Sequence, residues 1–187
     1  MIVRYLGSST DTAISITDTV ASDTFTARTG TLSATDADAG TTLTYGIANG
    51  TVTDGVATKV GTYGTLAVTA TSGAYTFTPN AAAINALSAN TTETFNVTVS
   101  DGTATTTASL TVNLTGVNDT PTVTAPATFA LTEDVAGNLT YTGTPFADVD
   151  SATLTVTLSV IDGTITGNEG TGITVAGSAT APSAGLV

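Results

Sequence analysis

Short segments in which apolar and polar residues alternate recur along most of the chain, and Gly, Asn and Asp separate them. Alternation with a period of two is typical of a strand that buries one face. Residues 94–99 and 108–114 are the clearest examples, and residues 100–103 form a tight turn between them. Further strands are predicted at residues 2–6, 13–17, 24–34 with a break at Gly30, 43–47, 66–69 and 75–78. Strands at this spacing predict an all-β fold built as an antiparallel β-sandwich.

Turn residues and one helical segment complete this first set of elements. Asn49-Gly50 and Asp54-Gly55 are hairpin signals, because both positions of a type I′ turn need a positive φ. Residues 80–88 form the helix candidate, and Asn80 is expected to cap it. The side chains expected to turn from this helix toward the core are Ala82, Ile84 and Leu87. The aromatic side chains assigned to the core rather than to a ligand-binding surface are Tyr45, Tyr75, Phe77 and Phe95.

The segment from Leu114 to Pro121 reads as a joint between two β-domains. Pro121 cannot donate to a strand ladder, and Asn118 and Asp119 favour turns. Beyond the joint the chain repeats itself: Asp36-Ala37-Asp38 reappears as Asp148-Val149-Asp150. The second copy has no counterpart of residues 75–114. We therefore expect an N-terminal strand and linker at residues 1–11, a sandwich at 12–117 and a partial second repeat at 118–187.

Charge narrows the possible partners. The net charge is −12, and Arg4, Arg28 and Lys59 are the three cations. Binding to nucleic acid or to an anionic membrane needs clustered Lys and Arg, so neither partner is expected. The negative charges of such an acidic chain repel one another unless cations neutralise them. A divalent metal is therefore the first partner to consider.

Catalysis is not expected. The chain has no His and no Cys, so imidazole bases, thiol nucleophiles and thiolate metal sites are excluded. Paired carboxylates could hydrolyse glycosides, but the Asp pairs fall in turns that a metal explains better. The alternative to a structural module is a lectin-like module that binds carbohydrate through exposed loops.

Several blocks together resemble a known family. They are LSATDADAGTTLTYGI, YGTLAVTATSGAYTFTPNAAAINAL, FNVTVSDGTATTTASLTVNLTG and VNDTP, with ALTEDVAGNLTYTG and FADVDSATLTVTLSV in the second copy. In order and content they resemble VCBS-type repeats of bacterial cadherin-like surface proteins. The resemblance implies tandem Ig/cadherin-like β-sandwiches, the second incomplete, in a large extracellular adhesin or fibre of the RTX type. It also implies type I secretion, a surface glycan or protein as target, and calcium between domains.

Acidic residues supply the candidate metal ligands. Calcium takes six to eight oxygens, and an Asp-X-Asp turn can direct both carboxylates to one ion. The competing interpretation is that Asp merely caps and shapes a turn in solvent. The resemblance implies one interdomain site made by Asn118, Asp119, Glu133, Asp134, Asp148 and Asp150. It implies a second, N-terminal set made by Asp11, Asp23, Asp36, Asp38 and Asp101.

This second set departs from the family pattern. Ser22 stands where an acidic residue is expected before Asp23, and Thr10 and Ala13 replace the Asn and Pro of the linker. The central set keeps all of its members.

The partial second copy leaves two explanations open. Its early strands would expose apolar faces and unpaired edges, and residues 2–6 form a short apolar strand outside the matched repeat. A neighbouring copy could add that strand and build a head-to-tail fibre. Alternatively, the chain is a piece of a longer adhesin.

Overall fold

The computed structural model describes residues 13–38, 40–125 and 144–156, five single positions between 128 and 137, and the backbone of 173–175. The chain divides into two compact units, Met1–Asp119 and Thr120–Val187, which are described separately. The predicted strand at residues 2–6 lies outside the described residues, so strand addition between copies stays a prediction.

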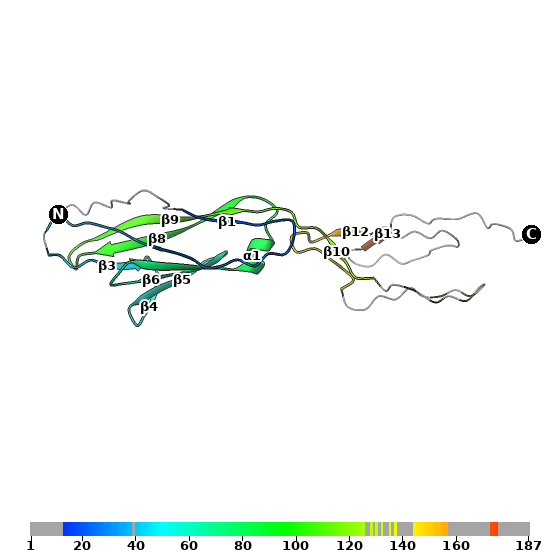
Figure 1. Cartoon of the computed structure of the whole chain (residues 1–187), viewed down its shortest axis with the longest axis horizontal. Helices are drawn as coiled ribbons and strands as arrows, with labels where there is room; N and C mark the ends of the chain where they lie inside the picture. The colour runs from blue at the N-terminus through cyan, green and yellow to red at the C-terminus, as the bar shows by residue number, and fades with distance from the viewer. Residues whose placement is uncertain are drawn as a thin grey trace, which may run out of the picture. The chain divides into compact units, whose positions relative to one another are not determined.

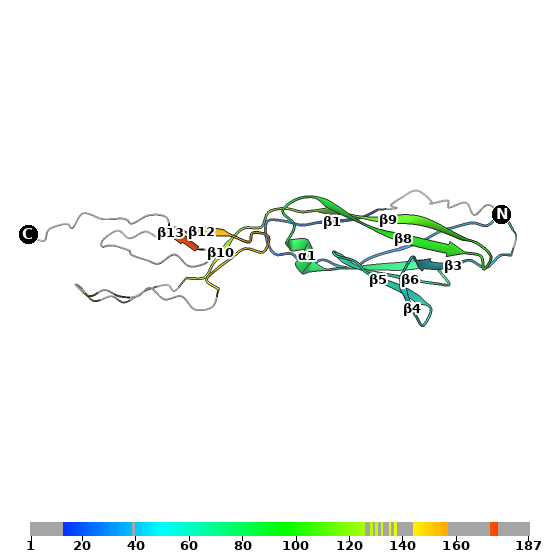
Figure 2. The ribbon, with the colours of Figure 1, turned by 180° about the vertical axis from the view of Figure 1, so that it is seen from behind.

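Unit 1 is a sandwich of two sheets, with α1 at one end and the turn between β8 and β9 at the other (Figures 1 and 2). The four-stranded sheet has the order β1-β9-β8-β3, made by Ala13–Thr17, Thr105–Thr115, Thr91–Ser100 and Thr44–Ile47. The five-stranded sheet has the order β2-β7-β6-β5-β4, made by Arg28–Thr31, Ala74–Pro79, Gly64–Thr69, Val56–Val60 and Thr51–Thr53. The all-β sandwich predicted from the alternating pattern is therefore confirmed.

The core lies between the sheets and follows the alternation in the sequence. In β6 every second residue is buried, and β8 and β9 show the same pattern at Phe95, Val97, Leu110 and Val112. The rings of Phe77 and Phe95 meet edge to face across the sandwich, with centroids 5.9 Å apart. Tyr45 and Tyr75 are partly buried against this core, as expected.

Two strand predictions need correction. The sandwich is not wholly antiparallel, because β1 runs parallel to β9 with Ala13 opposite Thr111. Gly30 does not break its strand but lies inside β2, which spans Arg28–Thr31 rather than residues 24–34. Gly30 faces Tyr75 on β7, and a Cβ at Gly30 would collide with the Tyr75 ring. The Tyr75 ring thus occupies the space beside the Gly30 Cα that a side chain would otherwise fill.

The helix is shorter than predicted. α1 spans Ala81–Asn85, and Asn80 caps it by accepting a hydrogen bond from the Ala83 N–H at 3.4 Å. Ile84 is fully buried and Leu87 packs against the core, but Ala82 is exposed. The side of α1 that faces the protein interior carries Ile84 and Asn85, and Ala82 is not on it.

The two hairpin signals have different outcomes. Asp54 and Gly55 both have positive φ, at 49° and 76°, and connect β4 to β5 as a two-residue turn. At the other signal, Asn49 has φ 57°, whereas Gly50 is not in the left-handed region. Gly50 is instead packed closely against the Ile47 and Thr58 carbonyl oxygens, 3.1 Å from where its Cβ would lie.

Unit 2 is described by two short strand pairs. β10 (Thr122–Val123) is antiparallel to β11 (Phe146–Ala147), and β12 (Leu154–Val156) is parallel to β13 (Ile173–Val175). The Thr124 N–H donates to the Pro145 carbonyl at 2.7 Å and extends the first pair. Within the described part of the chain, no helix is long and apolar enough to cross a membrane.

Candidate metal site

The site at the α1 end of unit 1 is centred on the buried acidic residue Asp18. Asp18 follows β1 directly, and its N–H donates to the Thr115 carbonyl at 3.0 Å, which continues the parallel pairing with β9. This pairing brings Asp18 beside residues 117–119, which lie 99 to 101 positions later in the chain. The Asp18 side chain is 1% exposed. It occupies the next inward-facing position after Ile14 and Ile16, which are buried on the same face of β1.

Neither carboxylate oxygen of Asp18 accepts a hydrogen bond from any described residue. Burial raises the pKa of this carboxyl group, and the charges of Asp119 and Asp23 raise it further. The nearby backbone amides of Val117 and Thr19 oppose the increase only in part. Asp119 is itself buried, with 3% exposure. The arrangement therefore holds two buried carboxyl groups close together, which costs free energy unless a proton or a cation joins them.

Asp23 closes the loop that follows Asp18. Its Oδ2 accepts the Thr19 N–H at 2.7 Å. Its backbone is held by Asn85 at the end of α1: the Asp23 N–H donates to Asn85 Oδ1 at 2.9 Å, and Asn85 Nδ2 donates to the Asp23 carbonyl at 3.0 Å. Asp23 is thus fixed at the α1 end of unit 1.

Asn118 stands next to this site but is exposed. Its side-chain Nδ2 donates to the Asp119 carbonyl at 2.6 Å, which fixes the turn just after β9. Asn118 and Asp119 were predicted as ligands from the sequence, and the structure brings Asp119 together with Asp18 and Asp23.

A second acidic group lies at the other end of unit 1. Asp36 Oδ1 accepts the Asp38 N–H at 2.9 Å, and Asp101 Oδ1 accepts the N–H groups of Thr103 and Ala104, both at 2.7 Å. The Ala104 and Thr103 amides lower the pKa of Asp101, and contact with the Asp36 side chain lowers it further. Asp36 and Asp101 are therefore neighbours, as predicted. Asp23 lies at the opposite end of the unit and does not share a site with them.

In unit 2, Asp148 repeats the turn made by Asp36. Its Oδ1 accepts the N–H groups of Asp150 and Ser151, both at 3.1 Å. The Asp150 side chain lowers the pKa of Asp148, and the two amides lower it as well. The turn interpretation therefore accounts for one oxygen of Asp36 and one of Asp148. Asp36 Oδ2 is buried and accepts no hydrogen bond from the described residues.

Three predicted ligands, Asp11, Glu133 and Asp134, lie outside the described residues. Among those that are described, no group of three or more Asp and Glu side chains has the geometry of a complete metal site. At the α1 end a cation would thus take its carboxylate oxygens chiefly from Asp18 and Asp119. Calcium commonly completes such a shell with backbone carbonyls and water.

Sequence reasoning missed Asp18, although a signal for it was present. Residues 13–17 alternate, and Ile14 and Ile16 mark the buried face. Position 18 continues that face, so an Asp there is an acid at a core position. An unpaired carboxylate at a core position is costly, and this makes it a candidate ligand.

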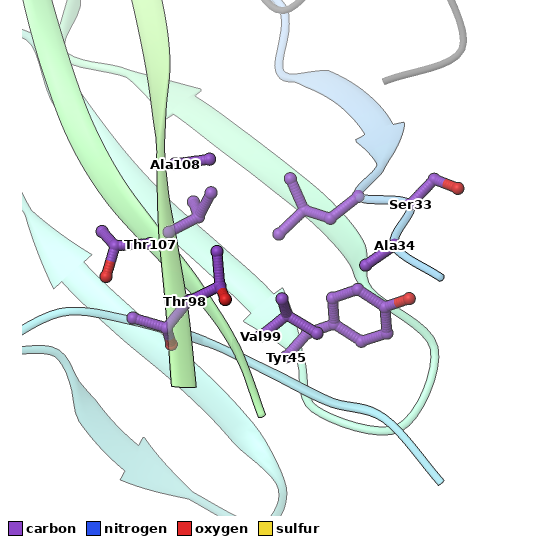
Figure 3. Close-up of a pocket in the computed structure, with 10 residues that line it drawn as sticks. Ser33, Ala34, Tyr45, Thr98, Val99, Thr107 and Ala108 are labelled. Atoms are coloured by element: carbon purple, nitrogen blue, oxygen red, sulfur yellow. The ribbon is translucent and has the colours of Figure 1, made fainter. Parts of the chain in front are cut away.

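A shallow hollow lies between the segment after β2 and strands β8 and β9 (Figure 3). Its empty volume is about 250 Å³, part of it open to solvent. Tyr45 and Val99 face Ala34 across it, and its polar groups are hydroxyls of Ser, Thr and Tyr. One aromatic ring and no carboxylate line it, so this hollow supplies neither a sugar platform nor an acid pair.

Comparison with known families gives one match. The model of a family described as "Bacterial cadherin-like domain" matches residues 8–116, which cover the described strands of unit 1. A search of curated proteins finds no match to this chain.

Proposed function

Because this chain belongs to the bacterial cadherin-like domain family, we propose that it is a structural repeat of an extracellular bacterial surface protein or fibre, made rigid by calcium. The cadherin-like all-β fold is that of a structural or adhesion-type module and is typically non-catalytic. The finer assignment to VCBS-type repeats of a secreted RTX adhesin rests on the sequence blocks of both copies.

The buried Asp18 carboxylate is the observation that carries the calcium proposal. The Asp18 carboxylate is 1% exposed, has no hydrogen-bond partner among the described residues and lies beside the buried Asp119. Its negative charge therefore needs a positive charge nearby to compensate it. Neither cation that the structure describes supplies this charge, because Arg28 is on β2 and Lys59 donates to the Ala48 carbonyl. A hard divalent cation would supply that charge to the Asp18 carboxylate and suits an all-oxygen site.

We assign the carboxylate ligands at this end to Asp18 and Asp119, with backbone carbonyls and water completing the shell. Both residues belong to the unit that ends at Asp119. An ion here would bind residues 118 and 119 to the loop after β1 and would stiffen the start of the connection to unit 2. A contribution from Glu133, Asp134, Asp148 and Asp150 to the same ion stays a prediction.

Thermal unfolding with calcium and with chelator tests the proposal. A ligand that binds only the folded state adds about 2.7 kcal/mol at a hundredfold excess over its dissociation constant. We expect the melting temperature to rise with calcium and titration calorimetry to detect saturable binding. Asp18→Asn should weaken that binding strongly. Identical melting curves in calcium and chelator would overturn the proposal.

A further inference from the structure

Asn85 is a polar residue buried beside the apolar core, where an apolar side chain would be expected. It ends α1 and is 4% exposed, and the neighbouring Ile84 is fully buried in the core. Its amide group makes two hydrogen bonds, both to the backbone of Asp23, which lies 62 positions earlier in the chain. A side chain that bonds both the N–H and the carbonyl of one residue fixes the position and the orientation of the backbone at that residue.

The two hydrogen bonds between Asn85 and the Asp23 backbone, called the clamp below, are linked directly to the acidic site. Asn85 holds the Asp23 backbone, and the Asp23 carboxylate accepts the Thr19 N–H at 2.7 Å. Thr19 follows Asp18, so a continuous series of contacts runs from the core through Asn85 and Asp23 to the residue next to the buried carboxylate. The loop at residues 18–23 is therefore fixed at both ends, by β1 and by α1.

The loop needs such support when no cation is bound. Asp18 is 1% exposed and neither of its carboxylate oxygens accepts a hydrogen bond from the described residues, so the loop carries a group that is costly to bury without a cation. The two Asn85 bonds involve neutral groups, so they do not depend on bound metal. We propose that Asn85 is a positioning residue that holds the 18–23 loop in its cation-binding shape before the cation arrives.

This inference rests on the proposed calcium site and adds its source of preorganisation. A loop that is already ordered does not lose conformational entropy when the ion binds. Residues that orient metal ligands from outside the coordination shell typically change metal affinity by 10- to 100-fold when they are replaced. We expect a loss of that size for Asn85→Ala.

The test uses the full chain and calcium chloride as the titrant. Calorimetry gives the dissociation constant of the unmodified protein, of Asn85→Ala and of Ile84→Val, and hydrogen exchange reports the Thr19 and Asp23 amides. Ile84→Val is the matched control, because it weakens the same helix in the core without touching the clamp. Asn85→Ala should raise the dissociation constant 10- to 100-fold and speed exchange at both amides, whereas Ile84→Val should lower the melting temperature and leave the dissociation constant within about twofold.

The outcomes separate the two proposals. If the unmodified protein binds calcium and Asn85→Ala binds it equally well, the positioning role is wrong and the calcium site stands. If both variants lose affinity in proportion to their melting temperatures, Asn85 has only a structural role and the inference is again wrong. If the unmodified protein binds no calcium, the proposed function fails and the positioning role with it. Asn85→Ser, which keeps a small polar group, replaces Asn85→Ala if that variant does not fold.

Discussion

At the scale of single residues, the burial of each Asp carboxylate decides how its charge affects stability. Asp23, Asp36 and Asp101 each accept a backbone N–H group in a turn or loop of unit 1. Asp18 differs because it is buried and its oxygens accept no hydrogen bond within the described residues. Its charge therefore destabilises the fold when no cation is bound.

Replacing this charge should stabilise the calcium-free protein. Asp18→Asn keeps the shape of the side chain and removes the repulsion with Asp119, so we expect the free energy of unfolding in chelator to rise by roughly 1–2 kcal/mol. Calcium should then raise the melting temperature much less than in the unmodified protein. Asp54→Asn, at an exposed turn position that Asn also tolerates, is the control and should change neither value.

Close packing sets a different requirement at Gly64. A Cβ on this residue would collide with the Phe77 ring and would lie 2.6 Å from the Thr78 carbonyl oxygen. We expect Gly64→Ala to lower the free energy of unfolding by about 1–3 kcal/mol, measured by urea denaturation, because the core must shift. Gly40 has φ 85° with open space around it, so Gly40→Ala tests backbone strain alone and should cost about 1–2 kcal/mol.

At the scale of elements, side chains on one sheet secure turns of the other. Glu93 projects from β8 in the four-stranded sheet and accepts the N–H groups of Thr62 and Tyr63, at 2.5 and 3.2 Å. These two residues form the turn between β5 and β6 in the five-stranded sheet. The contact ties the sheets together at a point outside the apolar core.

Removing this contact should loosen the turn. Glu93→Ala leaves two backbone N–H groups without their acceptor, and the contact is partly exposed to solvent, so we expect a loss of about 1 kcal/mol in the free energy of unfolding. Hydrogen exchange at the Thr62 and Tyr63 amides should increase. Thr92→Ala, at an exposed position on the same strand, should have neither effect; a similar response from both variants would contradict the assignment.

At the scale of the whole molecule, unit 1 contains its own core and its own candidate site. The buried hydrophobic residues that form the core cluster all lie between Ile14 and Leu114. Asp18, Asp23, Asn85 and Asp119 also lie within Met1–Asp119. Unit 1 is thus expected to fold and to bind a cation without unit 2.

A chain that ends at Asp119 tests this independence. We expect residues 1–119 to unfold cooperatively, with most of the calcium-dependent rise in melting temperature preserved. Calorimetric scans of this shorter chain and of the full chain, with calcium and with chelator, supply the comparison. Loss of the calcium response on shortening would show that ligands from residues 120–187 are essential.

Most of the strands could be predicted from the sequence, since a period of two is a local property of the pleat. Residues 13–17 match β1, and Asp54-Gly55 makes the expected turn, whereas Gly50 departs from it because packing against Ile47 and Thr58 intervenes. The proximity of Asp36 to Asp101 was implied by the family resemblance and not by the alternating pattern. The other contacts of the site depend on the tertiary fold. The parallel pairing of β1 with β9 brings Asp18 to Asp119, and the amide of Asn85 holds Asp23 from 62 residues away. Such contacts depend on how strands are ordered in a sheet, which alternation does not specify, so the sequence could mark Asp18 as buried but could not show that Asp119 lies beside it.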